Sequence, residues 1–259
     1  MSLVTDANYQ YYLGVGQSEA ITNNISPLIS VAEKRVKEFL NRDLEWQVYT
    51  DEFYNGNGRP RLILRQFPII AVSTIKVYEG IASGNTETWT TLVEHTDYDR
   101  MVLDIVRGAY ELYLDGYHFV NGYNNYKITY YAGYTAGATL TTGSSVVGKK
   151  YQIATRQSVD FTLVGASANT VGTQFVATGT SSMSATDSLT ELITVPEDIQ
   201  LACKKLVALY WNESPQKRNS VGLTTVNNTA GGAVQTLNVQ EDAESKILNS
   251  IIHHKAINV

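Results

Sequence analysis

The sequence predicts an α+β fold: a small helical bundle from N- and C-terminal helices, an inserted antiparallel β region, and a second small all-β insertion module. Near both ends of the chain, apolar residues recur at three- and four-residue spacing, which is typical of helices that bury one face. Within residues 46–132 the spacing changes to about two, which is typical of strands. Residues 138–193 are rich in Gly, Ser, Thr and Ala, and form a third compositional region.

The N-terminal helices are predicted within residues 5–41. Asp6–Leu13 is a short helical candidate with Thr5 as its N-cap. A longer helical region spans residues 18–40. The Ser26-Pro27 pair in its middle is either a kink or a fresh start, with Ser26 as N-cap and the proline as first helical residue.

The clearest helix is predicted at residues 195–212. Pro196 suits a first helical turn, and Glu197 and Asp198 place negative charge at the positive end of the helix dipole. The single cysteine lies on the apolar stripe of this helix, so we expect a buried structural thiol rather than a nucleophile. The stripe consists of Ile199, Ala202, Cys203, Leu206, Val207, Leu209 and Tyr210.

The C-terminal part combines a long polar stretch with a last helix. Ser214–Asn238 is predicted to be a long polar loop, and loops of this length in compact domains are usually functional or disordered. A helix is expected at residues 241–256. Its apolar stripe is formed by Ala243, Ile247, Leu248, Ile251 and Ile252.

The β region is predicted to contain six to eight short strands. Val48–Tyr54 and Arg61–Leu64 are expected to form a hairpin, because the Asn55–Gly58 segment supplies the positive φ angles of a tight turn. Further strands are expected at Val72–Tyr78, Trp89–Val93, Asp97–Asp104, Ala109–Leu114 and Tyr126–Tyr131.

Tyrosine is unusually frequent: the chain has 17, nine of them between Tyr98 and Tyr134. Aromatic rings pack well on pleated strands, so these residues fit an ordinary sheet. Tyrosine is also enriched at protein interfaces, so the same residues fit an interaction surface.

The stretch at 138–193 has no charge between Phe161 and Thr186, and a flexible linker is one interpretation of it. Regularly spaced bulky apolar residues favour a folded β module instead. Its strands are expected at Tyr151–Ala154, Asp160–Val164 and Thr173–Thr178, with turns at Gly165, Gly172 and Gly179.

Composition argues against several classes of function. The net charge of −5 argues against general nucleic-acid affinity, which needs basic surface. No apolar run is long enough to span a membrane. The chain lacks a Gly-rich phosphate loop, and no cofactor, metal site or enzymatic activity is expected. His253 and His254 are adjacent, so on a helix they are expected to point about 100° apart and not to clamp one metal ion.

Several segments resemble the head-tail connector (adaptor) proteins of long-tailed bacteriophages. They are VTDANYQYYLGV and LISVAEKRVKEFLNRDLE near the start, EFYNGNGRPRLILRQFPIIAVSTIKVY in the β region, and YKITYYAGYTA followed later by VPEDIQLACKKLVALYWNE. In the family, the last two segments are almost contiguous. Here residues 138–193 separate them, and VGKKYQIA, DFTLVGA and VGTQFVATG resemble a small β module inserted in phage structural proteins. The connector core would then comprise residues 1–137 plus 194–259.

The resemblance implies a structural virion protein, assembled in the host cytoplasm, with no enzymatic activity. It implies a ring, commonly of twelve copies, below the portal protein. Such a ring joins the DNA-filled head to the tail and extends the DNA channel, so that DNA only passes through. It also offers a platform to the next connector or tail-completion protein, and no membrane is involved.

The long polar loop is the expected contact with a neighbouring copy or partner. A loop that orders on binding loses entropy, which lowers affinity per contact. Two alternatives remain: a phage structural module that binds carbohydrate or a surface through Tyr123 and Tyr126, and a hydrolase with acids such as Asp97 and Asp104. The expected interface residues are Lys217, Arg218, Val221, Leu223 and Thr224.

Overall fold

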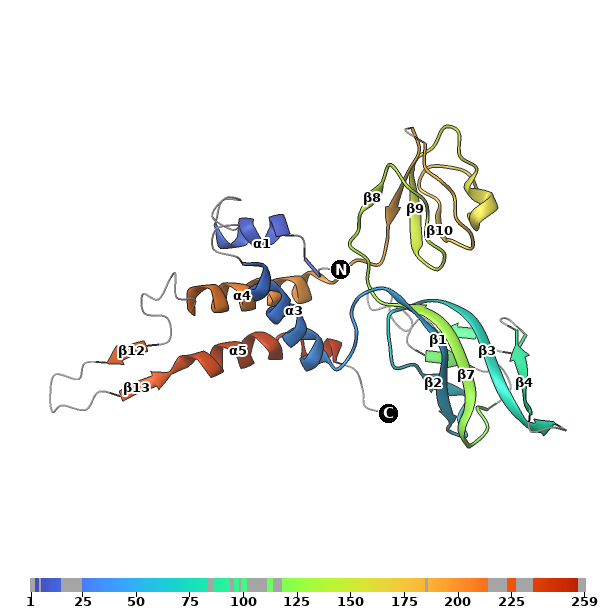
Figure 1. Cartoon of the computed structure of the whole chain (residues 1–259), viewed down its shortest axis with the longest axis horizontal. Coiled ribbons are helices and arrows are strands. Elements are labelled where there is room, and N and C mark those ends of the chain that lie inside the picture. The colour runs from blue at the N-terminus through green and yellow to red at the C-terminus, as the bar shows by residue number, and fades with distance from the viewer. Residues whose placement is uncertain are drawn as a thin grey trace. The chain divides into compact units, whose positions relative to one another are not determined.

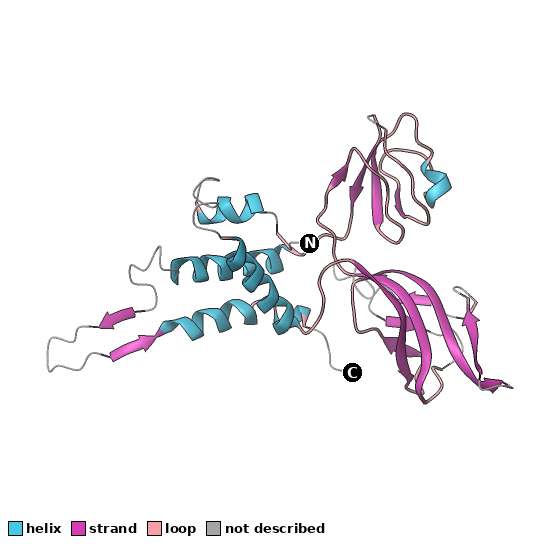
Figure 2. Cartoon of the chain, in the orientation of Figure 1, coloured by secondary structure: helices cyan, strands magenta, loops and turns pink. Residues whose placement is uncertain are grey.

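The computed structural model divides the chain into two compact units. One is formed by Met1–Arg42 and Val195–Ile257, and the other by Asp43–Thr194. Helices dominate the first and strands the second, which confirms the predicted α+β class (Figures 1 and 2). The structure describes residues 3–4, 6–14, 25–82, 86–93, 96–97, 99–101, 111–113, 118–184, 186–213, 223–226 and 235–255.

The helical unit brings together the two ends of the chain, as predicted. α4 packs against α1, α3 and α5, so the C-terminal helices complete the core begun by the N-terminal ones. No helix in the described part of the chain is long and apolar enough to cross a membrane. The elements are α1 (Asp6–Leu13), α3 (Ser26–Leu40), α4 (Glu197–Glu213), α5 (Val239–Asn249) and the 3₁₀ helix η2 (Ile252–His254).

The predicted stripe of α4 is the centre of this core. Leu209 and Tyr210 are only half-buried, because they lie at the border of the stripe. The buried position of Cys203 agrees with the expected structural thiol. The buried residues of α4 are Ile199, Ala202, Cys203, Leu206, Val207 and Trp211.

Helix α3 starts at Ser26, so the fresh start and not the kink is observed. The capping residue is Ile25, and no side chain caps the helix; the prediction that Ser26 is the N-cap was wrong. Proline in the first turn is compatible with this start because its missing N–H has no partner there. Thr5 and residues 18–24 lie outside the described residues.

The second unit contains a large antiparallel sheet of strand order β1-β7-β3-β4. A smaller three-stranded sheet has the order β2-β6-β5. The strands are β1 (Gln47–Gly56), β2 (Arg61–Ile63), β3 (Ile69–Ala82), β4 (Thr86–Leu92), β5 (Asp99–Met101), β6 (Glu111–Tyr113) and β7 (Gly122–Ala132).

The expected hairpin between Val48–Tyr54 and Arg61–Leu64 is wrong, because β1 pairs with β7 and β2 pairs with β6. The segment between β1 and β2 is instead bonded to Phe119. Gly58 N–H donates to the Phe119 carbonyl at 2.7 Å, and Phe119 N–H donates to the Arg59 carbonyl at 2.9 Å. The glycines therefore serve a loop that packs on the chain before β7, and not a turn between paired strands.

From Tyr126 to Ala132, strand β7 alternates between buried and half-buried residues, as a strand over a core must. Its buried face packs with residues from β1, β2, β3 and the loops into one apolar cluster. The cluster contains Tyr54, Leu62, Leu64, Ile69, Ile75, Phe119, Tyr126, Ile128, Tyr130 and Ala132.

Residues 139–191 form a four-stranded antiparallel sheet of order β10-β9-β11-β8, so this stretch is folded and is not a linker. The strand expected at Asp160–Val164 is a 3₁₀ helix, η1 (Phe161–Val164). The Asp160 carboxylate accepts the N–H of Thr162 at 3.0 Å, and Gly165 ends the turn at φ 107°. The strands are β8 (Thr139–Leu140), β9 (Lys150–Thr155), β10 (Gln174–Val176) and β11 (Ser188–Glu191).

Candidate functional site

The expected interface residues lie in or beside a β-hairpin. Lys217, Arg218 and Val221 fall outside the described residues. Leu223 and Thr224 lie on β12 (Leu223–Val226). This strand pairs antiparallel with β13 (Gln235–Asn238), in register Leu223↔Asn238 and Thr224↔Leu237.

The long polar loop expected at Ser214–Asn238 therefore contains two strands that sequence reasoning missed. The only available signal was the short β-branched run Thr224-Thr225-Val226, which is too brief to distinguish a strand from a loop. β13 runs directly into α5, which begins at Val239 rather than at residue 241. The hairpin thus connects α4 to α5 (Figure 1).

Among the described residues, the β12–β13 sheet contains only these two strands. A two-stranded hairpin by itself is marginally stable in water. The outer edge of each strand carries backbone groups that can pair with another chain. The hairpin is therefore suited to pairing with a further strand.

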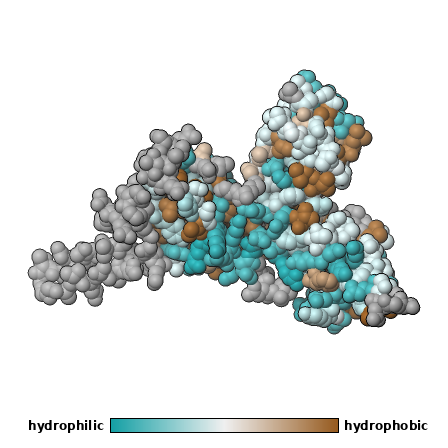
Figure 3. All heavy atoms as spheres, viewed as in Figure 1, coloured by the Kyte–Doolittle hydropathy of each residue, from teal (hydrophilic) through white to brown (hydrophobic). Residues whose placement is uncertain are grey.

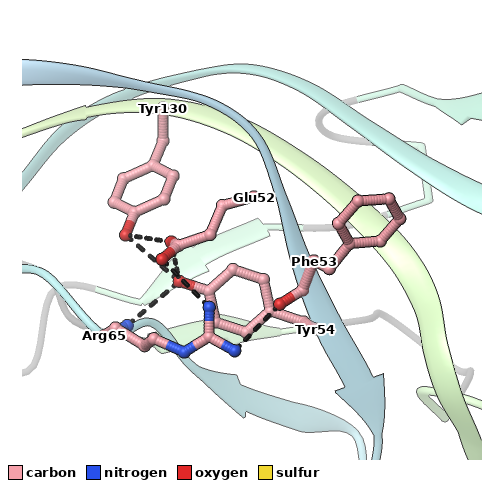
Figure 4. Close-up of polar contacts among 5 residues, drawn as sticks. All are labelled: Glu52, Phe53, Tyr54, Arg65 and Tyr130. Carbon is pink, nitrogen blue, oxygen red and sulfur yellow. Dashed lines mark hydrogen bonds and ion pairs between the residues drawn. The ribbon is translucent and has the colours of Figure 1, made fainter.

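The large sheet contains a polar cluster around the Glu52 carboxylate (Figure 4). Tyr130 donates its hydroxyl hydrogen to this carboxylate at 2.8 Å, Tyr54 does the same, and the Arg65 guanidinium donates at 3.0 Å. Arg65 also donates to the Phe53 carbonyl at 2.9 Å. The cluster links β1, β7 and the chain after β2.

This Glu52 cluster is a structural network. Tyr54 and Tyr130 are buried, and burial is the main cause that raises the pKa of both phenols above the usual value. Both hydroxyls are therefore neutral at physiological pH and act as hydrogen-bond donors to Glu52. The Glu52 side chain is partly buried, at 23% exposed, and its carboxylate with three donors is satisfied, so the cluster stabilises the sheet.

Three of the described tyrosines in the Tyr98–Tyr134 segment are buried: Tyr126, Tyr130 and Tyr134. Tyr126 and Tyr130 lie on β7 and belong to the apolar cluster of the sheet, which supports the sheet-packing interpretation for these two. Tyr123 is different, with 84% of its surface exposed. Of the two tyrosines considered for carbohydrate binding, only Tyr123 is accessible.

An aromatic group lies on the other face of the same sheet. Lys127 of β7 places its ammonium 4.0 Å from the Trp89 ring centroid and 5.0 Å from that of Phe53. Tyr78 meets Trp89 edge-on, with ring centroids 5.3 Å apart. On the face in Figure 3, hydrophobic residues over the second unit form several separate groups, whereas hydrophilic residues predominate over the helical unit.

The two C-terminal histidines converge, contrary to expectation. His253 Nε2 lies 2.9 Å and His254 Nε2 lies 2.7 Å from Asp198 Oδ2. They belong to the tight 3₁₀ turn η2, and the carboxylate on the first turn of α4 lies within reach of both rings. Sequence reasoning missed this histidine cluster, Asp198–His253–His254, because Asp198 is more than fifty residues away from the two adjacent histidines.

The acidic residues considered for hydrolysis form no described pair. Asp97 accepts the backbone N–H of Val93 at 2.7 Å, as a turn residue does. Asp104 and the side chain of Asp99 lie outside the described part of the structure. His118 is exposed, and His95 is outside the described residues.

No protein-family model and no curated protein sequence matches the chain. Among solved structures, it is similar to a chain described as the neck of an empty GTA particle computed with C6 symmetry. The two chains share 10% sequence identity at a TM-score of 0.38, and the match covers 98% of this chain and 89% of the other. A similarity of this degree assigns the chain to no family.

Proposed function

We propose that this chain is a structural connector of a phage-like particle, without enzymatic activity. It forms a ring below the portal protein, joins the DNA-filled head to the tail and extends the DNA channel. The supporting observation is the helical unit, in which helices from both chain ends pack together and a two-stranded hairpin is inserted between α4 and α5. The sequence resemblance to connector proteins, carried by the segments that form these helices, points the same way.

A ring requires a contact between two different surfaces that repeats around an axis until it closes. The hairpin is suited to be one of these surfaces because a neighbouring copy can add a strand to it. In this proposal Leu223 and Thr224 lie at the contact through β12. Lys217, Arg218 and Val221 contact the same neighbour from the chain segment that leads into that strand.

The family resemblance sets the further details of the proposal. The ring has twelve copies, its second partner is the next connector or tail-completion protein, and DNA passes through it without specific binding. The protein resides in the virion. The core comprises residues 1–137 plus 194–259, and the module at 138–193 projects outward because both of its ends attach at one place.

The ring is tested by electron microscopy of the purified protein mixed with its portal protein, together with mass measurement of the protein alone. We expect rings stacked coaxially on the portal. Particles without such rings at saturating protein contradict the proposal.

The hairpin contact is tested with Thr224→Pro and its matched control Thr224→Val. Proline removes a ladder N–H and does not fit a paired strand, whereas valine favours one. We expect T224P to lose ring formation while keeping the helical circular dichroism of the wild type, and T224V to assemble normally. Normal rings with T224P would show that β12 is not the contact.

A second function is favoured by one observation, the exposed ring of Tyr123. Exposed aromatic rings can stack on sugars, and the alternative is a structural module that binds carbohydrate. A glycan-array signal lost in Tyr123→Ala and kept in Tyr126→Phe would favour this alternative, since Tyr126 is buried. If the wild type binds no glycan on the array, the carbohydrate-binding alternative is contradicted.

A further inference from the structure

The histidine cluster has a chemistry that the connector function does not use. We propose that it binds a divalent transition-metal ion of the Zn²⁺ type, held by Nε2 of His253, Nε2 of His254 and Oδ2 of Asp198. This inference does not rest on the proposed connector role.

The geometry is close to that of a bound site. The three ligand atoms all lie within 4.8 Å of one another. A tetrahedral ion with bonds of about 2.0–2.2 Å holds its ligand atoms about 3.3 Å apart. The two nitrogens lie 2.7 and 2.9 Å from the carboxylate oxygen, so their distances to that oxygen are about half an ångström shorter than this spacing.

The direction of the imidazoles also fits. Both Nε2 atoms point at the same carboxylate oxygen. An Nε2 that donates to this oxygen carries a hydrogen, and in the tautomer without this hydrogen the nitrogen lone pair points in the same direction. A change of tautomer therefore presents both lone pairs to one point. Asp198 is held in place because its other oxygen accepts the N–H of Ile199 at 2.9 Å.

The donor set selects the class of ion. Two imidazoles and one carboxylate suit Zn²⁺, Ni²⁺, Co²⁺ or Cu²⁺, whereas Ca²⁺ and Mg²⁺ prefer oxygen ligands. Three protein ligands leave a fourth position for water. The side chains of His253 and Asp198 are 44% and 40% exposed, so water reaches this position.

The charges around the cluster act on it in opposite directions. Burial, partly opposed by Asp198, lowers the pKa of His254. Burial is the largest influence on the pKa of Asp198 and acts to raise it. The hydrogen bond and charge of His254, with smaller contributions from the Ile199 N–H and His253, together outweigh burial, so the net pKa is lowered. The positive charge of Arg42 also acts on His254 and opposes a cation, and the Asp198 carboxylate offsets it.

A bound ion would join the last turn of the helical unit to the first turn of α4. These elements are distant in sequence, so binding is expected to stabilise the unit as ligands of a folded state do. The ion would thereby hold the η2 turn, which follows α5, against the start of α4.

The test is calorimetric titration of the tag-free full chain with ZnCl₂ at pH 7.5, accompanied by a thermal-unfolding scan. We expect one ion per chain and a higher unfolding temperature with the ion. His253→Gln removes a ligand whose side chain is 44% exposed, so the fold is retained, and binding is expected to weaken at least about tenfold. His118→Gln removes an exposed histidine of the other unit and is expected to bind as the wild type.

Two results would overturn the proposal. One is that the wild-type chain does not take up one zinc ion per molecule. The other is equal binding by the wild type and His253→Gln, which would place the ion elsewhere. Asp198→Asn gives an independent check, because it keeps the size of the side chain and removes the charge; unchanged affinity in this variant also counts against the site.

Discussion

Gly148 lies directly against the ring of Tyr131: a Cβ on this glycine would stand 2.1 Å from the ring carbon Cδ1. Tyr131 in turn stacks on Trp46, with centroids 6.2 Å apart, and the Trp46 indole N–H donates to the Gly148 carbonyl at 3.4 Å. The residues come from β7, from the chain before β1 and from the chain before β9. This contact therefore joins the large sheet to the 139–191 sheet within the second unit.

The first prediction uses this contact. Gly148→Ala is expected to cost about 1–2 kcal/mol for its left-handed backbone and a further ~1–3 kcal/mol for displacing the Tyr131 ring. Gly143→Ala is a matched control because it has the same φ of 83° and open space around its Cβ. Urea unfolding of both variants gives the difference in their free energies of unfolding. Equal losses of free energy in the two variants would show that the contact with the Tyr131 ring does not contribute to stability.

The second prediction concerns the buried Glu33. Its Oε1 accepts the N–H of Leu3 at 2.8 Å and the hydroxyl hydrogen of Tyr9 at 3.0 Å, so it ties the N-terminal segment to α3. Tyr9→Phe is expected to lower the free energy of unfolding by about 1–3 kcal/mol, because a hydrogen bond to a carboxylate is lost. Tyr11→Phe, at a 90% exposed position, is expected to change it by less than about 0.5 kcal/mol. Similar values for both variants would contradict this role of Glu33.

The third prediction concerns alkaline pH. The pKa of Tyr130 is raised in the folded state, mainly by burial, whereas an unfolded tyrosine titrates near pH ~10. Above that pH the unfolded chain loses a proton that the folded chain keeps, so stability is present below about pH 10 and falls as pH rises further. Tyr130→Phe is expected to reduce this slope by up to ~1.4 kcal/mol per pH unit. Urea unfolding at pH 8–11 measures how the free energy of unfolding changes with pH. If Tyr130→Phe does not alter this pH dependence, the prediction is contradicted.

The fourth prediction concerns acid. Asp187 accepts hydrogen bonds from the hydroxyls of Ser158 and Ser184 and from the N–H groups of Gln157 and Ser158, and these bonds lower its pKa. Its stabilising contribution is therefore present above the unfolded pKa of about 3.9 and is lost as pH falls through the folded value.

Asp187→Asn is expected to raise hydrogen exchange in residues 139–191 at pH 7. The difference from the wild type should shrink as pH is lowered from about 4 towards 2. Ser184→Ala, which removes one of the donors, should give an intermediate effect. Hydrogen exchange in the helical unit serves as the internal control. If the difference in exchange between Asp187→Asn and the wild type does not change with pH, the prediction is contradicted.

The helices were the most predictable part of the fold. Most residues predicted for the apolar stripe of α4 are buried, and α1 has the predicted bounds. Helical hydrogen bonds and capping are local, so the period of apolar residues in one segment is enough to identify them. Leu209 and Tyr210, at the border of the stripe, show the limit, because the width of the buried face depends on the neighbouring helices.

Strand pairing was less predictable. Asn55–Gly58 has the composition of a hairpin turn, yet β1 pairs with β7, which is distant in sequence. Likewise Asp160–Val164 alternates like a strand, but an Asp160 cap and Gly165 close it into a 3₁₀ turn. In both cases the segment has two compatible conformations, and the contacts that select one come from residues elsewhere in the chain.

The order of apolar and polar residues along the chain is sufficient to establish helical ends, a β-rich middle and a folded module within 138–193, because these properties depend on near neighbours in sequence. The partners of β1 and β2, the β12–β13 ladder and the meeting of Asp198 with His253 and His254 are decided only in the folded molecule. Each of them joins residues that the chain has to bring together from a distance, and the free energy of such contacts depends on how the intervening segments pack.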